Sequence, residues 1–179
     1  NILVNTLSTD AQLLINTYIG NAEVLPPSSE FIEKAKQLEI CLDLLEKDHF
    51  SYNRILTSKL FLEAYAVIRA RHYSKYPEAK QKLKEALKIE DRAAYIHNAL
   101  GVVLNHENNY DEAEFHYKKA NYLIPTWSFP LNNIGSNFYE QHRYEEGKAY
   151  LEQALKLQGS YASALNNLGT ISESQGKYT

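Results

Sequence analysis

Apolar residues recur through the second half of the chain with a period of 34 residues. The period is clearest at Gly101, Gly135 and Gly169, each of which follows a Leu or an Ile. Two further positions keep the same interval, with a tyrosine at Tyr76, Tyr110, Tyr144 and Tyr178 and an alanine at Ala86, Ala120 and Ala154. A fixed period of about 20 to 50 residues is typical of repeat architectures. The pattern therefore predicts a stack of small units rather than one globule.

Before residue 60 the period is lost, and helices are predicted from local spacing. Residues 28–47 are predicted to form an amphipathic helix, because their apolar residues at helical spacing are Phe31, Ala35, Leu38, Leu42 and Leu45. Pro26 and Pro27 stop any helix before it. A longer helix is expected over residues 52–72.

The first 25 residues show the least regular pattern. Ser8 or Thr9 would cap a short helix that runs through Tyr18 and ends at Gly20. Residues 1–59 are therefore expected to form an irregular helical N-terminal cap, which repeat arrays generally need. Because the chain contains no Met and stops within a repeat unit, we expect the natural protein to extend beyond both ends.

The repeated positions resemble the tetratricopeptide repeat (TPR) family, whose units carry a large apolar residue, Leu-Gly, an aromatic, and then Ala, an aromatic, Ala and Pro. In unit 94–127 these positions are His97, Leu100, Gly101, Leu104, Ala113, Tyr117, Ala120 and Pro125. In unit 128–161 they are Leu131, Ile134, Gly135, Phe138, Gly147, Leu151, Ala154 and Gly159. The resemblance implies an all-α fold, an alpha-alpha superhelix (TPR solenoid) of antiparallel helix pairs. It adds a degenerate repeat at 60–93 and a truncated repeat at 162–179.

Each unit is too small to bury its own apolar faces, so only stacking closes the core. Small residues such as Gly101 and Ala120 let neighbouring helices approach closely, as ridge-into-groove packing requires. Replacing either by a large residue should wedge the helices apart.

In this family the first helix of each pair lines a concave groove, and the same positions of each unit face inward. On this chain they make the groove aromatic at one end and rich in amides at the other. The aromatic candidates for anchoring a partner are Tyr65, Tyr95, Phe129 and Tyr139, and the amide candidates are Asn98, Asn132, Asn133, Asn166 and Asn167.

The asparagines are the sharper sign of function, because Asn is a poor helix former and needs a reason to lie inside a helix. An amide has donors and an acceptor, so it can hold the main chain of an extended peptide without reading its sequence. Asn133 and Asn167 match the position at which the family often does this. The alternative interpretation is that the amides are solvated or bond to neighbouring helices.

Another specialisation of the family is a basic clamp for the C-terminal carboxylate of chaperone tails. Arg71 is the only Lys or Arg at an inward position, and one Arg cannot supply such a clamp. Trp127 lies at the junction of two units, where we expect it to pack between repeats, as buried Trp usually does.

Composition excludes several function classes. The net charge is -3, and the lysines of the densest basic stretch, residues 80–88, have Glu78, Glu85 and Glu90 as opposite-charge neighbours, which indicates a solvated helix face rather than a nucleic-acid site. No apolar run approaches the roughly 18 residues that cross a bilayer. We therefore expect a soluble protein without membrane insertion, with the cytoplasm favoured. Cys41 is the only cysteine, which excludes an internal disulfide, and it is interpreted as a small buried apolar residue.

No catalytic constellation is found, and no metal or cofactor is expected. The six His residues fall at unrelated repeat positions, and Tyr110 stands where a zinc protease would need a second His after His106-Glu107. The glycines sit singly at the repeat period, so no phosphate-binding loop is formed. The chain is predicted not to be an enzyme.

Three functions stay open. The leading one is a scaffold whose concave groove binds a peptide or a partner protein. The second is a regulatory or targeting arm of a larger protein, which could carry a catalytic domain. The third is a self-association element that forms a homo-oligomer, in which residues 1–25 pack into another copy's groove or the solenoid ends stack.

Overall fold

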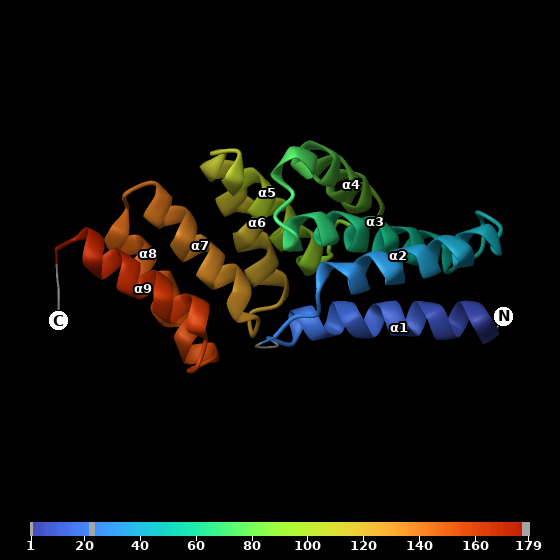
Figure 1. Cartoon of the computed structure of the whole chain (residues 1–179), viewed down its shortest axis with the longest axis horizontal. Helices are drawn as coiled ribbons and strands as arrows, with labels where there is room; N and C mark the ends of the chain where they lie inside the picture. Colours follow the sequence, from blue (N-terminus) through green and yellow to red (C-terminus); the bar gives the residue numbers. More distant parts are fainter. Residues whose placement is uncertain (1, 22–23, 177–179) are drawn as a thin grey trace.

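The computed structural model describes residues 2–21 and 24–176, so Tyr178 lies outside the described residues. Within these ranges the chain forms nine α-helices, one 3-10 turn and no strand. The helices follow one another along the length of the molecule, from α2 and α3 at one end to α9 at the other (Figure 1). Their bounds are α1 Ile2–Ile19, α2 Ser28–Asp43, α3 Tyr52–Arg69, α4 Tyr76–Ile89, α5 Ala94–His106, α6 Tyr110–Leu123, α7 Ser128–Glu140, α8 Tyr144–Leu157 and α9 Ala162–Ser174.

The repeat pattern appears as pairs of consecutive helices. Helices α5 and α6 form one pair, α7 and α8 form the next, and α9 packs against both members of that second pair. The predicted all-α solenoid is confirmed. The first helices of successive repeats, α3, α5, α7 and α9, touch one another in order. They therefore form one continuous inner layer.

Gly101 and Gly135 lie where two helices approach each other closely. A Cβ added at Gly101 would lie 2.5 Å from Cε1 of Tyr117, and one at Gly135 would lie 2.6 Å from Cγ of Leu151. Both distances are shorter than carbon atoms tolerate. The expected role of Gly101, which is to let two helices come together, agrees with this geometry.

The first helix of the degenerate repeat ends early. Each of α3, α5 and α7 is followed by a residue in the left-handed region, which is Arg71 (φ 54°), Asn108 (φ 60°) or His142 (φ 58°). In the repeat register Arg71 comes three residues before its counterparts, and the 3-10 turn Tyr73–Lys75 takes up the difference. The expected helix over 52–72 therefore ends at Arg69.

The N-terminal cap differs from its prediction at two helix ends. Helix α1 begins by Ile2, not at Ser8 or Thr9. Their hydroxyls donate to the carbonyl oxygen of Asn5 at 3.2 and 2.7 Å, so they bond back into the helix instead of capping it. Helix α2 ends at Asp43 rather than at residue 47, because the chain tightens there into i→i−3 turns such as Leu45 N to Leu42 O.

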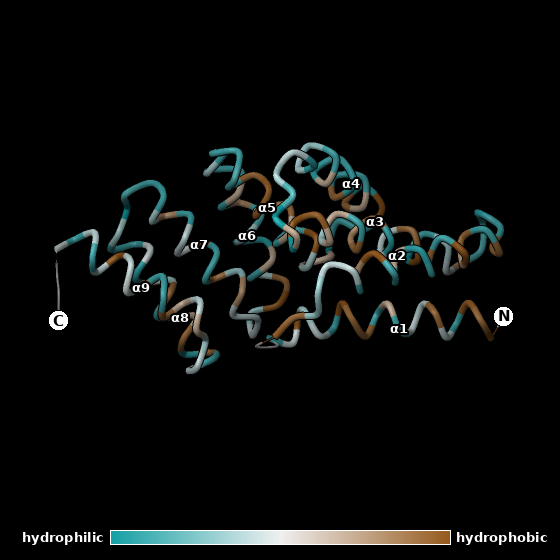
Figure 2. Tube along the Cα trace, viewed as in Figure 1, coloured by the Kyte–Doolittle hydropathy of each residue, from teal (hydrophilic) through white to brown (hydrophobic). Residues whose placement is uncertain are grey.

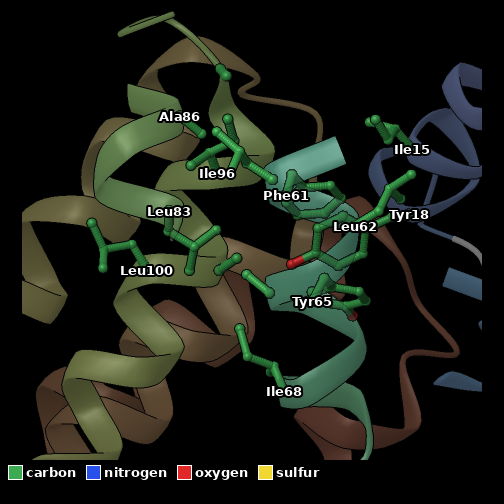
Figure 3. Packing of buried hydrophobic residues seen from close by; sticks show 14 of the residues in the cluster. Ile15, Tyr18, Phe61, Leu62, Tyr65, Ile68, Leu83, Ala86, Ile96 and Leu100 are labelled. Carbon is green, nitrogen blue, oxygen red and sulfur yellow. The ribbon is translucent and has the colours of Figure 1, made fainter. Parts of the chain in front are cut away.

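A continuous cluster of buried apolar side chains runs from α1 to α7, and a smaller one joins α7, α8 and α9. Hydrophobic residues recur along α1 (Figure 2), and Ile15 and Tyr18 reach from it toward α3 (Figure 3). Cys41 and Trp127 are fully buried, as predicted. None of the helices in the described ranges combines the length and apolar character needed to cross a bilayer.

Candidate peptide-binding groove

The inward face of the first helices has two parts, here called sides, which lie toward the start and toward the end of these helices and differ in what covers them. One side, here the occupied side, consists of Phe61, Tyr65, Asn98, Trp127 and Phe129, and the end of α1 lies against it. The other, the open side, surrounds a cavity of about 500 Å³. Its lining includes Arg71, Asn105, His106, Asn133, Ser136 and Glu140.

Tyr18 of α1 fills the occupied side with its aromatic ring. Its ring centroid lies 4.5 Å from that of Tyr65, 4.9 Å from Trp127, 5.7 Å from Phe129 and 5.9 Å from Phe61. Figure 3 shows Tyr18 beside Phe61 and Tyr65. Such aromatic pairs contribute beyond the area they bury. With α1 in place, the predicted aromatic end of the groove is internal packing rather than free surface.

Two hydrogen bonds fix this tyrosine. Asn98 Nδ2 donates to the Tyr18 hydroxyl at 2.5 Å, and Trp127 Nε1 donates to the Tyr18 carbonyl oxygen at 3.2 Å. Burial raises the pKa of Tyr18 well above its ordinary value. The hydroxyl therefore stays protonated and neutral in the folded chain.

Four of the predicted asparagines form a chain of hydrogen bonds across three repeats, here called the amide ladder. Asn167 Nδ2 donates to Asn132 Oδ1 at 3.0 Å, and Asn132 Nδ2 approaches Asn133 Oδ1 at 3.4 Å. Asn133 Nδ2 donates to Asn98 Oδ1 at 3.0 Å, and Asn98 continues to Tyr18. In the ladder the amides bond to neighbouring helices, as the alternative interpretation from the sequence described.

The ladder residues differ in accessibility. Asn98 is 1% exposed and Asn132 is 7% exposed, so neither offers its amide to a partner while α1 is docked. Asn133 and Asn167 are half-buried, and Asn133 also lines the open side. Asn166 lies outside the ladder and is exposed.

Of the aromatic candidates, Tyr65 and Phe129 lie on the occupied side and Tyr95 joins it through Phe61, whereas Tyr139 lies apart. Tyr95 packs edge-on against Phe61 at 4.7 Å, and Phe129 stacks on Tyr161 at 5.3 Å. Tyr139 is half-buried beside Tyr144, with its hydroxyl 3.4 Å from Ser174 Oγ. The structure therefore does not gather the four predicted aromatic anchors into one surface.

The open side combines polar groups with an aromatic stack. His106 lies 4.2 Å from the Tyr73 ring in a stacked arrangement, and Tyr76 meets the same imidazole edge-on. The Oδ1 atom of Asn105 is buried and accepts no hydrogen bond from the described residues. A buried acceptor without a donor costs free energy.

Sequence reasoning missed Tyr18 and Asn21, which dock α1 on the groove. Asn21 has φ 58°, and Asn is one of the few residues that tolerate this region. A Gly20-Asn21 pair after an apolar helix was the available signal, because it marks a turn. Nothing in the repeat period pointed to these residues, since they precede it.

The described residues also contain a buried histidine pair between α5 and α6. His97 Nδ1 and His116 Nδ1 are 2.8 Å apart, and His97 Nε2 lies 2.9 Å from the carbonyl oxygen of Asp91. His97 thus donates through Nε2 and accepts at Nδ1 from His116. Elsewhere in the described ranges, no three His, Cys, Asp or Glu side chains gather as metal ligands would.

Comparison with known proteins places this geometry in a family. The sequence model of the tetratricopeptide repeat matches residues 68–122 and 132–179. No curated protein sequence matches the chain.

Solved structures with the same fold include the first TPR domain of Spaghetti (RPAP3) bound to the HSP90 peptide SRMEEVD. It has 18% identity and a TM-score of 0.60, over 67% of this chain and 93% of that one. PilF of Pseudomonas aeruginosa has 28% identity and a TM-score of 0.61, over 70% of this chain and 56% of that one. A tetratricopeptide repeat protein from Parabacteroides merdae has 12% identity and a TM-score of 0.64, over 99% of this chain and 62% of that one. The chain belongs to the tetratricopeptide repeat family.

Proposed function

We propose that this chain is a non-catalytic interaction module that holds a peptide segment of a partner protein on the open side of its groove. The cavity of about 500 Å³ between α3, α5 and α7 carries this proposal. Its lining mixes main-chain-like amides with aromatic and apolar surface, as peptide sites do.

Asn133 is the residue best placed to hold a peptide main chain. Its Nδ2 is oriented by Asn98 Oδ1, and its Oδ1 faces Asn132 Nδ2 at a long 3.4 Å. A side chain already held in one orientation loses less conformational entropy when a ligand binds. Asn133 is therefore prepared to share its second N–H and its carbonyl oxygen with a peptide.

Asn105 adds a second contact point. It is half-buried and lines the cavity, so its amide N–H groups can donate to a peptide carbonyl oxygen. Arg71, which is exposed at the same cavity, would pair with an acidic side chain of the partner. The first TPR domain of Spaghetti, which has this fold, holds an HSP90 peptide, and this supports a peptide as the ligand class.

The proposal is tested by selecting random 12-residue peptides displayed on phage against the purified chain, and then measuring their binding to two variants. Ser136→Tyr fills the open side, because Ser136 is half-buried and lines the cavity. Gln153→Tyr places the same side chain at an exposed position on α8 and serves as the control.

We expect Ser136→Tyr to weaken the selected peptides by about tenfold or more, since the new side chain takes their volume, while Gln153→Tyr leaves them unchanged. Equal binding to both variants, or no selected peptide at all, would show the proposal to be wrong. The folded state of each variant is checked by circular dichroism.

The double change Asn133→Ala and Asn167→Ala tests the amides directly. Both side chains hold neighbouring helices together, so these changes should also lower the melting temperature. Peptide capture is therefore compared well below the melting temperature, where loss of binding without loss of helicity supports the proposal.

The two other functions remain proposals. The matched part is 56% of the PilF chain and 62% of the Parabacteroides merdae chain, so this fold also occurs within longer polypeptides, as a regulatory arm would require. Self-association would show as a mass that rises with concentration in sedimentation. A mass that stays at one chain up to high concentration would remove it.

A further inference from the structure

The end of α1 docks on the array through a short segment, Tyr18 to Asn21, here called the latch. Tyr18 contacts the occupied side as described above. Asn21 Nδ2 donates to the carbonyl oxygen of Thr126 at 3.1 Å, and its Oδ1 accepts from the backbone N–H of Ser128 at 2.9 Å. Gln158 Nε2 donates to the Asn21 carbonyl oxygen at 3.3 Å.

These contacts reach three consecutive repeats. The Tyr18 ring packs on the repeat 60–93 at Phe61 and Tyr65 and bonds to Asn98 of the next, and Asn21 caps the start of α7 in the third. In a solenoid each repeat touches only its neighbours. A segment that joins three repeats from outside the period behaves like a ligand laid along the groove.

The latch also bonds as a bound peptide would. The Asn21 amide pairs with Thr126 and Ser128 through one donor and one acceptor, just as a peptide unit pairs with a neighbouring strand. Tyr18 is the aromatic anchor with a polar end that hot spots favour. The occupied side is thus a built recognition site whose ligand belongs to the same chain.

The rest of α1 packs through one apolar face, on which Val4, Ala11 and Leu14 are buried. Ile2 is 87% exposed and Leu13 is 65% exposed on its outer face. Asp10 of α1 pairs with Lys34 of α2 at 3.1 Å, but its carboxylate is exposed. Such surface ion pairs contribute little to stability. Release of the latch would therefore leave α1 attached mainly by one apolar face on α2.

We propose that the occupied side is a recognition site for a helical segment that ends in a tyrosine followed three residues later by an asparagine, and that α1 is its exchangeable intramolecular occupant. A partner segment with the same chemistry displaces α1 and takes Asn98, Trp127 and Ser128 as its contacts. The proposal does not depend on the open side binding anything, and its test uses the chain's own segment.

The tyrosine hydroxyl is required because Asn98 Nδ2 is buried and needs an acceptor. A phenylalanine at that place would leave the donor unpaired, and sites built to bond a hydroxyl discriminate strongly against ligands that lack one. The asparagine is required because its side chain donates to Thr126 and accepts from Ser128, and because Asn tolerates the positive φ found here.

The chain carries a reporter for release of α1. Cys41, the only cysteine, is fully buried, and its Sγ lies 4.0 Å from the carbonyl oxygen of Val4 in α1. A thiol reagent therefore reaches Cys41 when α1 leaves. A synthetic peptide of residues 11–21 contains the latch but not Val4, so it can fill the occupied side and leave Cys41 uncovered.

The first experiment adds this peptide at up to millimolar concentration to the full wild-type chain and measures the rate at which the reagent modifies Cys41. We expect a saturable acceleration of about tenfold, because the peptide displaces α1. Millimolar concentrations are needed because the peptide competes with a tethered segment of high effective concentration. The same peptide carrying Tyr18→Phe and Asn21→Gly should not accelerate the reaction. Equal effects of both peptides, or none, would overturn the proposal.

The second experiment uses the full chain with Tyr18→Phe and Asn21→Gly, which removes the side-chain hydrogen bonds of the latch, while Gly keeps the positive φ. The matched control is Tyr122→Phe with Asn108→Gly, since Tyr122 is exposed and Asn108 has φ 60°. We expect Cys41 in the latch variant to react about tenfold faster than in the control, and the unaltered peptide to bind it more tightly than the wild-type chain. Cys41 reactivity equal to that of the control contradicts the proposal, and the wild-type experiment decides the question if the variant loses helicity.

Discussion

The repeat 94–127 and the last repeat, described to residue 176, place the same residue types at the same positions in different surroundings. Gly101 and Gly169 share one position, but a Cβ at Gly101 would strike Tyr117, whereas one at Gly169 would meet nothing within 4 Å. Asn98 and Asn166 share another, and the first is buried while the second is exposed. The repeat register therefore determines the backbone position of a residue, and its neighbours determine what the residue does.

The cause of the difference is what covers each repeat. Helix α5 is covered by α6 on one face and by the end of α1 on the other. Helix α9 has contacts only with α7 and α8 among the described elements. The predictions below test whether this coverage, rather than the sequence position, accounts for the difference.

The largest effect is expected for Trp127→Ala. Trp127 is fully buried and bonds to Tyr18, and removing a buried Trp costs about 3–5 kcal/mol of unfolding free energy. Tyr161 takes the same position in the next repeat but is only half-buried, so Tyr161→Ala should cost clearly less. Urea unfolding followed by circular dichroism compares the two, and equal losses would contradict the role of coverage.

The glycine pair should respond with opposite signs. Gly101→Ala forces the Tyr117 ring away, and overpacking of this kind costs about 1–3 kcal/mol. Gly169→Ala meets no neighbour within 4 Å and should stabilise the helix by about 0.5–1 kcal/mol, because Ala loses less backbone entropy than Gly. The same unfolding curves measure both changes, and a stabilising Gly101→Ala would be incompatible with the close approach described above.

The asparagine pair should separate the ladder from the exposed surface. Asn98→Ala removes partners from Tyr18 and Asn133, and unpaired buried polar groups cost about 1–3 kcal/mol each. Asn166→Ala should change the unfolding free energy by less than about 0.5 kcal/mol, as surface substitutions usually do. Thermal melting of the two variants side by side gives the comparison, and similar melting temperatures would count against the ladder.

The histidine pair should make one repeat sensitive to pH where the next is not. Burial lowers the pKa of His97, and burial together with the neighbouring His97 lowers the pKa of His116 to about 4. The unfolded chain, with ordinary His pKa values, then binds more protons than the folded chain between about pH 4 and 6.5. The contribution of the neutral His97–His116 pair to the free energy of unfolding is therefore fully present above about pH 6.5 and is lost as the pH falls toward about 4.

The matched change copies the next repeat, where Leu131 and Tyr150 hold the positions of His97 and His116. The double variant His97→Leu and His116→Tyr should show a smaller fall in melting temperature between pH 7 and 5 than the wild-type chain. An unchanged fall would assign the pH dependence to other groups.

Much of the fold followed from the sequence because the repeat period repeats the same packing. The period located α5 to α9 and the close approach at Gly101, and local spacing located α2. The end of α3 was misplaced, because Arg71 enters the left-handed region three residues before its counterparts do in the later repeats. The start of α1 was misplaced because Ser8 and Thr9 can bond into a helix as well as cap one.

The candidate site was predicted less completely. Inward positions were taken from the repeat register, and Asn133 does line the open cavity. The burial of Tyr65 and Asn98 could not be predicted, because the side chain that covers them, Tyr18, lies outside the repeats and far away in sequence. The ladder depends on distances between helices, which spacing along one chain does not report.

The sequence by itself determined the repeating backbone of this protein, since a 34-residue period of apolar and small residues specifies helix pairs that bury their apolar faces by stacking. The tertiary structure alone decided which positions of that backbone are free to bind. Burial depends on which distant segment packs where, and the end of α1, with the Tyr18 ring, turns predicted surface into interior.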